Sequence, residues 1–360
     1  MSASGACPTA RACLEAKLTA AWLHRGALAS ALWPVSLLYR CLVALRRLAY
    51  RLRLVRSARL ARPVLVVGNR VAGGAGKTPT VIALLAHLQA QGWQPGVVSR
   101  GYGRSTHGLV AVTAATPPHA AGDEPLLIHL RSGAPVVVGA DRVAAARALL
   151  VAHPEVNLLV CDDGLQHLRL QRDVDVVVFD ARGAGNGWLL PAGPLREPLA
   201  APSSAATSLL LYNAPAPSTP LPGFVARRCL TGAVALDDWW RGRPATAAGL
   251  TALRGRRLYA CAGIAQPQAF FALLRAQGLD FEALTLPDHA GLDVLPWPAD
   301  AADVIVTEKD AVKLETGRVA RERPATTVWV APLNFSPEPA FLAALDAALA
   351  PHRGVARVEG

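Results

Sequence analysis

The sequence has little that would support a disulfide-stapled or zinc-binding protein. Its six cysteines are scattered over 360 residues, and none of them forms a C-x-x-C pair. Hydrophobic residues make up 52% of the chain, so an ample core can form without covalent cross-links. We therefore expect a reducing compartment and no structural zinc site.

Lysine is scarce, and so is acidic charge near the N-terminus. Only four of the 37 basic residues are lysines (Lys17, Lys77, Lys309 and Lys313). Residues 1–62 contain 11 basic residues and a single acid, a balance of +10, whereas residues 63–360 contain 26 bases and 25 acids, a balance of +1. A nucleic-acid enzyme would carry its basic surface on the body. We therefore expect no nucleic-acid partner, and nothing in the sequence indicates an obligate protein partner.

The N-terminal segment lacks a long uninterrupted hydrophobic run. The apolar run at 27–39 ends at Arg40 after 13 residues, whereas a helix that spans a bilayer needs about 20. An amphipathic pattern follows, with apolar and arginine residues on opposite faces. The apolar face holds Leu38, Leu42, Leu45, Ala49 and Leu52, and the basic face holds Arg40, Arg47 and Arg51.

This pattern predicts a helix that lies in a membrane interface, with its arginines toward anionic headgroups. The alternatives are a helix packed on the body and a secretory signal peptide. A nucleotide-type loop follows at once, which disfavours export.

From Pro63 onward, short apolar runs alternate with helical ones. The expected strands are 63–69, 96–100, 135–139, 157–163 and 174–181, with helices at 78–92 and 141–154. This alternation predicts an α/β fold with a parallel sheet covered by helices on both faces. A stretch rich in proline, alanine and serine follows, after which a second, smaller α/β unit begins. The expected divisions are an amphipathic arm (1–62), a nucleotide-binding domain (63–213), a linker (214–228) and a smaller domain (229–360).

The clearest chemical motif is a glycine-rich phosphate loop between an expected strand and an expected helix. It reads Gly73-Gly74-Ala75-Gly76-Lys77-Thr78. Glycines let backbone N–H groups surround a phosphate, Lys77 would reach the β- and γ-phosphates, and the Thr78 hydroxyl would bind Mg²⁺. The strict G-x-x-x-x-G-K-[ST] pattern is not met, because Val71 stands where the first glycine belongs. A glycine-rich turn without a ligand is the alternative, but the strand and helix on either side favour nucleotide binding.

Two adjacent carboxylates follow another apolar run. Asp162 and Asp163 end the segment NLLVCDDG at 157–164. A phosphate loop needs an acid at the end of a neighbouring strand to organise its metal, directly or through water. We expect one of these two residues to hold Mg²⁺; the alternative is that Asp163 belongs only to a turn.

Several segments taken together resemble one family, the tetraacyldisaccharide 4′-kinases of lipid A assembly. They run in order over about 250 residues and follow a basic amphipathic arm that the family also has. The matching segments are GGAGKTP (73–79), SRGYGR (99–104), GDEP (122–125), APVVVGADR (134–142), DDGLQH (162–167), LLPAGPLREPL (189–199), PDH (287–289) and TEKDAVK (307–313). Departures are small: Ala75 stands where the family usually has Thr, and the first twenty residues have no obvious counterpart.

The resemblance implies a membrane-associated kinase that uses ATP and Mg²⁺. Its reaction phosphorylates the 4′-hydroxyl of an acylated glucosamine disaccharide 1-phosphate and yields lipid IVA. It also implies a peripheral location on the cytoplasmic face of the bacterial inner membrane, with the smaller domain closing over the active site.

The resemblance further implies a catalytic pair from the two domains. Asp123 in GDEP would be the base that accepts the sugar hydroxyl proton, and His289 in PDH would pair with it. From the residues alone, Asp123 could equally be a helix N-cap before Pro125, and His289 would be read as a surface histidine near a turn.

Five further residues are candidate contacts to phosphate or sugar. They are Arg100, Tyr102, Gln166, His167 and Arg196. Arginine suits phosphate because its guanidinium donates bidentate hydrogen bonds, but each of these residues could instead serve a structural ion pair.

Two other classes of protein remain as rivals. A regulatory ATPase of the chromosome-partitioning type would carry a lysine where this loop has Ala72. A GTP-driven targeting factor would carry [NT]-K-x-D, and TEKD at 307–310 is one residue out of that register. We interpret TEKD as a strand-end motif of the second domain.

Overall fold

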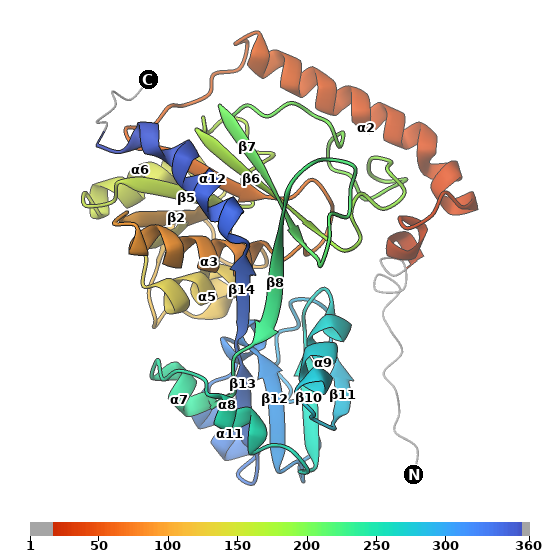
Figure 1. Cartoon of the computed structure of the whole chain (residues 1–360), viewed down its shortest axis with the longest axis vertical. Coiled ribbons are helices and arrows are strands. Elements are labelled where there is room, and N and C mark those ends of the chain that lie inside the picture. Colours follow the sequence, from red (N-terminus) through yellow and green to blue (C-terminus); the bar gives the residue numbers. More distant parts are fainter. Residues whose placement is uncertain (1–16, 355–360) are drawn as a thin grey trace.

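The computed structural model describes residues 17–354 and contains two β-sheets joined by a pair of strands (Figure 1). The larger sheet has nine strands in the order β14-β8-β7-β6-β1-β5-β2-β4-β3. These strands are β1 (Val64–Gly68), β2 (Pro95–Ser99), β3 (Val110–Val112), β4 (Val136–Val138), β5 (Leu158–Asp162), β6 (Val174–Asp180), β7 (Thr207–Asn213), β8 (Phe224–Leu230) and β14 (Leu333–Pro337).

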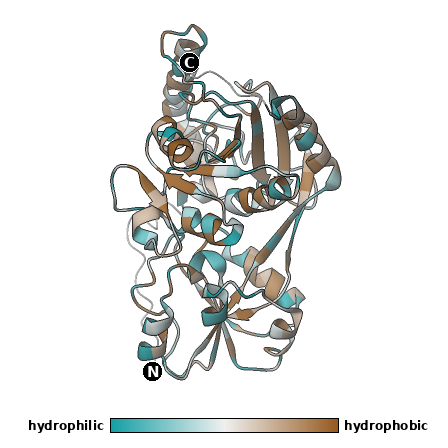
Figure 2. Cartoon of the chain, turned by 90° about the vertical axis from the view of Figure 1, so that its left-hand side faces the viewer, coloured by the Kyte–Doolittle hydropathy of each residue, from teal (hydrophilic) through white to brown (hydrophobic). Residues whose placement is uncertain are grey.

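Pairing in the centre of this sheet is parallel. Strands β8, β7, β6, β1, β5, β2 and β4 pair in parallel with their neighbours, whereas β3 and β14 pair antiparallel at the two edges. Strands β1, β5 and β6 are buried along their whole length, as expected where helices cover both faces. Figure 2 shows the strands largely in the hydrophobic colour.

Helices cover both faces of the larger sheet. Helices α3 (Lys77–Ala90), α5 (Asp123–Ser132) and α12 (Pro339–Leu349) share one apolar cluster with Leu65 and Val67 of β1. Helix α6 (Arg142–Ala152) packs in a second cluster with Val64 and Val66, which point to the opposite face. The short helices α4 (Pro118–Ala121) and η1 (Ala350–His352) complete this unit. The expected fold class is confirmed.

The smaller unit has five strands in the order β11-β10-β12-β13-β9. The strands are β9 (Val234–Ala235), β10 (Leu258–Ala262), β11 (Glu282–Thr285), β12 (Asp303–Thr307) and β13 (Thr327–Ala331), and the helices are α7 (Leu236–Trp240), α8 (Ala247–Thr251), α9 (Pro267–Ala276), α10 (Glu308–Ala311) and α11 (Thr316–Glu322). Its buried side chains Val304 and Val306 belong to the same apolar cluster as α3 and α5. The two units therefore share part of their core.

The last strand and helix return to the larger sheet. β14 pairs antiparallel with β8, with Leu333 opposite Leu230, and α12 packs against β7 and β8. The sequence divisions assigned all of 229–360 to the smaller domain and 214–228 to a linker. Strand β8 instead begins inside the expected linker and continues beyond it, because its long-range partner β14 completes the ladder. Residues 1–16 and 355–360 of the expected divisions lie outside the described residues.

Helix α2 (Ala27–Arg51) crosses one side of the larger unit (Figure 1). It is 25 residues long, and by length and composition it could cross a membrane. The expectation of a run too short to span therefore does not hold for the helix as a whole. One face rests on the body: Ser36 Oγ donates to Leu189 O at 2.6 Å, Tyr39 Oη donates to Arg196 O at 2.9 Å, and Arg47 pairs with Glu197 at 2.5 Å.

The opposite face of α2 leaves leucines in contact with solvent. Leu38, Leu42 and Leu45 are each about 60% exposed. Their common face agrees with the amphipathic pattern of the sequence. Arg47, however, faces the body and Glu197, so it is not among the arginines open to headgroups.

Candidate active site

The phosphate loop lies between β1 and α3, as the sequence predicts. Gly76 has φ of +82°, a left-handed conformation that glycine adopts without strain, and α3 begins at Lys77. Asn213 Nδ2 donates to Ala75 O at 3.1 Å, and Arg182 Nη2 donates to Gly74 O at 2.9 Å. Neighbouring strand ends therefore hold the loop in shape.

The two expected metal-organising carboxylates lie at the end of β5, which is parallel to β1. Asp162 is buried; its Oδ2 accepts from Ser99 Oγ at 3.1 Å, while its buried Oδ1 has no hydrogen-bond partner among residues 17–354. Burial raises the pKa of Asp162 to about 7, and the charges of Glu124 and Asp163 act in the same direction. A cation at this carboxylate would supply the missing partner.

Asp163 connects the phosphate loop to the segment around Arg196. Its carboxylate lies 3.4 Å from Lys77 Nζ and 3.3 Å from Arg196 Nη1. Burial works against ionisation, but these two cations together lower the pKa of Asp163. Asp163 has φ of +50°, and His289 has φ of +61°. Such conformations are costly for residues other than glycine and occur preferentially at functional sites.

Asp123 and His289 meet across the gap between the two units. His289 Nδ1 lies 3.1 Å from both carboxylate oxygens of Asp123, and Tyr102 packs on the imidazole with ring centroids 5.1 Å apart. Burial opposes ionisation of Asp123, but the hydrogen bond from His289 and the charge of Lys309 lower its pKa. Burial would lower the pKa of His289, but its bond to Asp123 raises it.

The N-cap interpretation of Asp123 does not match this geometry. Gly122 occupies the N-cap position of α5, and the cap has no side-chain hydrogen bond. Asp123 is the first helical residue. Within the described chain, its Oδ1 accepts hydrogen bonds from two groups only, the N–H of the adjacent Glu124 and the ring of His289.

Lys309 adds a second contact between the units. Its Nζ lies 3.0 Å from Glu124 Oε1, 3.0 Å from Asp288 Oδ1 and 3.1 Å from His289 Nε2. Burial would lower the pKa of Lys309, but Glu124, Asp123 and Asp288 raise it, so the side chain stays charged. The smaller unit therefore presents a cation to carboxylates on α5 beside the phosphate loop.

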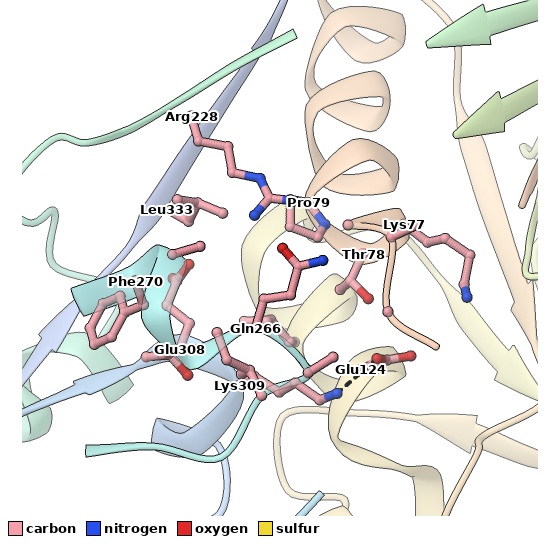
Figure 3. A pocket seen from close by; sticks show the side chains of 18 of the residues that line it. Lys77, Thr78, Pro79, Glu124, Arg228, Gln266, Phe270, Glu308, Lys309 and Leu333 are labelled. Carbon is pink, nitrogen blue, oxygen red and sulfur yellow. Dashed lines mark hydrogen bonds and ion pairs between the residues drawn. The ribbon is translucent and has the colours of Figure 1, made fainter. Parts of the chain in front are cut away.

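A cleft of about 180 Å³ runs between the phosphate loop and the smaller unit (Figure 3). Thr78 and Pro79 line one side, Glu124 and Lys309 lie at one end, and Phe270 closes the opposite side. A wider groove of about 960 Å³ is lined by Tyr102, Asp123 and His289. The site therefore has two spaces, and the Asp123–His289 pair lines the wider one.

Comparison with known proteins identifies the family. The family model for tetraacyldisaccharide-1-P 4′-kinase matches residues 28–350. The chain belongs to this family. A tetraacyldisaccharide 4′-kinase from Methylibium petroleiphilum is 70% identical over 95% of both chains, and one from Leptothrix cholodnii is 56% identical over 94% of this chain and 97% of its own.

A solved structure agrees with this assignment. The crystal structure of LpxK from Aquifex aeolicus, in a complex with ATP, superimposes with a TM-score of 0.71 at 26% identity and covers 90% of this chain and 99% of its own. The resemblance read from the sequence is thus confirmed, as are the expectations of a tetraacyldisaccharide 4′-kinase and of ATP as its nucleotide.

Within this kinase fold, the five candidate substrate contacts are not all equivalent. Tyr102 is 65% exposed and borders the groove, Arg196 pairs with Asp163, and Arg100 is exposed at the end of β2. Gln166 Nε2 donates to Asn69 O at 3.1 Å, and its Oε1 accepts from Arg196 at 3.4 Å. Four of the five therefore lie around the ends of β1, β2 and β5.

His167 differs from the other four. Its buried Nε2 has no hydrogen-bond partner within the part of the chain that the structure describes, and its backbone oxygen accepts from Arg172. Burial lowers the pKa of His167 to about 4, and the nearby charge of Arg142 acts in the same direction. Of the five candidates, only Tyr102 lines the groove, and none of them lines the cleft. This environment is that of a neutral structural histidine.

Several residues of this kinase site were not assigned by the sequence analysis. Glu124 lies next to Asp123 in GDEP, and Asp288 lies next to His289 in PDH. Their place in these two motifs could have identified them as candidates. Asp180 ends β6, where Arg182 Nη2 donates to it at 2.6 Å and Gln266 of the smaller unit donates at 2.5 Å. Asp180 stands in no recognised motif, and its partner Gln266 lies 86 residues away in the sequence, so no local signal marks it.

Proposed function

We propose that this protein transfers the γ-phosphate of ATP to the 4′-hydroxyl of a tetraacyldisaccharide 1-phosphate, giving ADP and lipid IVA. The bond between the 4′-oxygen and the γ-phosphorus forms as the bond between that phosphorus and the β,γ-bridging oxygen breaks. The hydroxyl proton passes to Asp123. The observation that carries the proposal is the Asp123–His289 pair, held at 3.1 Å beside the phosphate loop of a member of this kinase family.

In this proposal ATP lies along Gly73–Thr78. The backbone N–H groups of the loop and the dipole of α3 favour the phosphate chain, and Lys77 neutralises the β- and γ-phosphates. Lys77 is paired with Asp163 at 3.4 Å, a contact loose enough to be exchanged for phosphate oxygens. This supports a loop ready to take an anion.

The residues at the end of β5 fit a magnesium ion. Asp162 offers a buried oxygen that has no hydrogen-bond partner in the described part of the chain, and Thr78 lines the nucleotide cleft. The residues that the structure describes contain no group of three or more His, Cys, Asp or Glu side chains suited to a metal. That fits Mg²⁺, which protein sites bind through one or two carboxylates with phosphate and water completing the shell. When bound, the ion would neutralise charge on the β- and γ-phosphates.

Asp123 is suited to orient the acceptor hydroxyl. A lowered pKa keeps its carboxylate ionised at neutral pH, and the two contacts to His289 Nδ1 fix its rotation. The sugar would approach from the groove lined by Tyr102, His289 and Asp123, so that its hydroxyl reaches the carboxylate as closure excludes water. Arg196, Gln166 and Arg100 are further candidates for phosphate or sugar contacts.

We also propose that α2 holds the protein at the cytoplasmic surface of the inner membrane, without spanning it. Its body-facing side is fixed by Ser36, Tyr39 and Arg47, while Leu42 and Leu45 are exposed. A half-docked amphipathic helix suits an interface. High salt with mild detergent should release the protein from membranes. Removal of the N-terminus by protease added outside spheroplasts would contradict this arrangement.

A phosphate-transfer assay tests the function directly. Purified protein is incubated with γ-labelled ATP, Mg²⁺ and tetraacyldisaccharide 1-phosphate in detergent micelles, and the lipids are separated by thin-layer chromatography. We expect label in a lipid with one additional phosphate, and none with Lys77→Ala. Label that appears only as inorganic phosphate would contradict the kinase proposal and favour an ATPase.

A further inference from the structure

Arg228 is a cation in the nucleotide cleft that no part of the proposed mechanism uses. It lies on β8, the strand that leads from the larger sheet into the smaller unit, and it lines the same cleft as Gly76 and Thr78. A Cβ atom built on Gly76 would lie 2.9 Å from Arg228 Nη2. The guanidinium thus reaches the last glycine of the phosphate loop.

Asn213 fixes the orientation of this guanidinium. The amide nitrogen of Asn213 donates to Ala75 O at 3.1 Å, so its oxygen must face the other way. That oxygen accepts a short hydrogen bond from Arg228 Nε. Because Nε already donates to Asn213, the two terminal nitrogens of Arg228 remain available as donors. Their planar arrangement is the one that binds phosphate.

Among residues 17–354, no carboxylate forms an ion pair with Arg228. Asp180 is the acid whose charge acts on it, but that carboxylate already accepts from Arg182 and Gln266. Burial lowers the pKa of Arg228, and the charge of Asp180 offsets this effect only in part. A partly buried cation of this kind needs an anion.

The anion must lie at a particular end of the loop. Figure 3 shows the guanidinium of Arg228 directed toward Pro79 at the start of α3, while Lys77 points away on the other side of Thr78. Phosphate-loop lysines reach the β- and γ-phosphates. Arg228 is therefore on the side where the α-phosphate would lie.

We infer that Arg228 is a nucleotide-binding residue whose terminal N–H groups hold the phosphate chain of ATP at the end opposite Lys77, with Asn213 as its positioning residue. The inference rests on the proposed binding of ATP at the phosphate loop. Because this contact does not involve the γ-phosphate, ATP and ADP both use it. It also links the nucleotide to the strand that joins the two units.

The test measures the binding of ATP and of ADP, each with Mg²⁺, to the full chain by calorimetry. Arg228→Gln should weaken both nucleotides by about the same factor, between about 10-fold and 100-fold, the worth of a charge-assisted hydrogen bond. Arg227→Gln is the matched control, since it removes the same charge from the adjacent, exposed position on the other face of β8. It should bind both nucleotides like the parent protein.

Two further variants separate a phosphate contact from a purely structural role. Arg228→Lys retains the charge but not the bond to Asn213, so it should lose less affinity than Arg228→Gln. If Arg228 served only to hold Asn213, then Arg228→Lys, Arg228→Gln and Asn213→Ala would all lose affinity equally, which would overturn the inference. Melting curves without nucleotide identify variants that fail to fold, and Arg228→Lys, with its retained charge, keeps the test decisive if Arg228→Gln does not fold.

The remaining outcomes are also decisive. Loss of ATP binding with normal ADP binding would overturn the placement opposite Lys77, and affinities equal to those of Arg227→Gln would overturn the contact itself. Lys77→Ala, measured in the same experiment, tests the underlying proposal. If Lys77→Ala weakens ATP binding and Arg228→Gln does not, only the role of Arg228 fails. If Lys77→Ala binds ATP normally, the nucleotide site itself has been misplaced.

Discussion

Replacement of Asp123 by asparagine separates catalysis from structure more sharply than any other single change in this site. Asparagine has nearly the same shape, and its side-chain oxygen can still accept from His289 Nδ1, so the contact between the two units is largely kept. What is lost is the negative charge and the ability to take a proton. The neighbouring Glu124 keeps its own contact with Lys309 at 3.0 Å.

The expected magnitude follows from that loss. A positioned general base contributes about 10²- to 10⁴-fold to a rate, which corresponds to about 3–5 kcal/mol in the barrier. We expect kcat to fall by that factor while the Kd for ATP stays within about twofold of the parent value, because the phosphate loop and Arg228 are unchanged. The effect on stability should be small, since Gly122 and not Asp123 caps α5.

Initial rates of lipid phosphorylation at saturating ATP measure this directly. Asp293→Asn provides the matched control, because Asp293 lines the same groove, is exposed and loses the same charge. It should retain nearly full kcat. A near-normal kcat for Asp123→Asn would refute the assignment of Asp123 as the base. An equal loss in Asp293→Asn would show that the general charge of the groove matters, and not a positioned carboxylate.

The remaining predictions concern the phosphate loop, His289 and helix α2. Lys77→Ala should abolish lipid phosphorylation with only a small change in melting temperature, because Asp163 retains its arginine partner. His289→Ala should lower kcat less than Asp123→Asn, and the double variant should be little worse than Asp123→Asn alone. The folded state raises the pKa of His289. The stability that the parent protein has over His289→Ala should therefore be largest below about pH 6.5 and should disappear as the pH rises through the raised pKa. Melting curves recorded across this pH range would measure the difference. Replacing both Leu42 and Leu45, each about 60% exposed, by glutamine should weaken liposome binding in flotation assays without lowering the melting temperature. Unchanged flotation would argue against this face of α2 as the membrane contact.

Local chemistry explains which parts of the site could be predicted from the sequence. The loop Gly73–Thr78 and the pair Asp162–Asp163 are short motifs next to buried strands, and parallel strands bring their carboxyl ends to one edge of a sheet. Their positions therefore follow from sequence order. Asp123 and His289 are 166 residues apart, and only the family resemblance linked them. The structure brings them within hydrogen-bonding distance.

Long-range pairing explains most of what the sequence did not predict. Strand β8 carries alternating Phe224, Ala226, Arg228 and Leu230, but it follows a proline-rich stretch and pairs with β14, more than 100 residues later. Before that partner is known, the segment reads as a linker. Arg228 was missed for the same reason, because a lone arginine in an expected linker predicts only a solvated charge. The burial of His167 Nε2 and the lowered pKa of its imidazole favour a structural role, and its assignment as a substrate contact stays a prediction.

The first turn of α5 explains how one short motif can serve both spaces of the site. Successive residues of an α-helix point about 100° apart, so Asp123 borders the groove while Glu124 lines the nucleotide cleft. The smaller unit meets both of them, with His289 on Asp123 and Lys309 on Glu124. Both contacts are largely buried, so removing one partner would leave an uncompensated charge, and the intact pairs align the two units. In the proposed mechanism, the smaller unit holds Asp123 in position, so that its carboxylate accepts the hydroxyl proton where water is excluded; this would favour transfer to the lipid over hydrolysis of ATP.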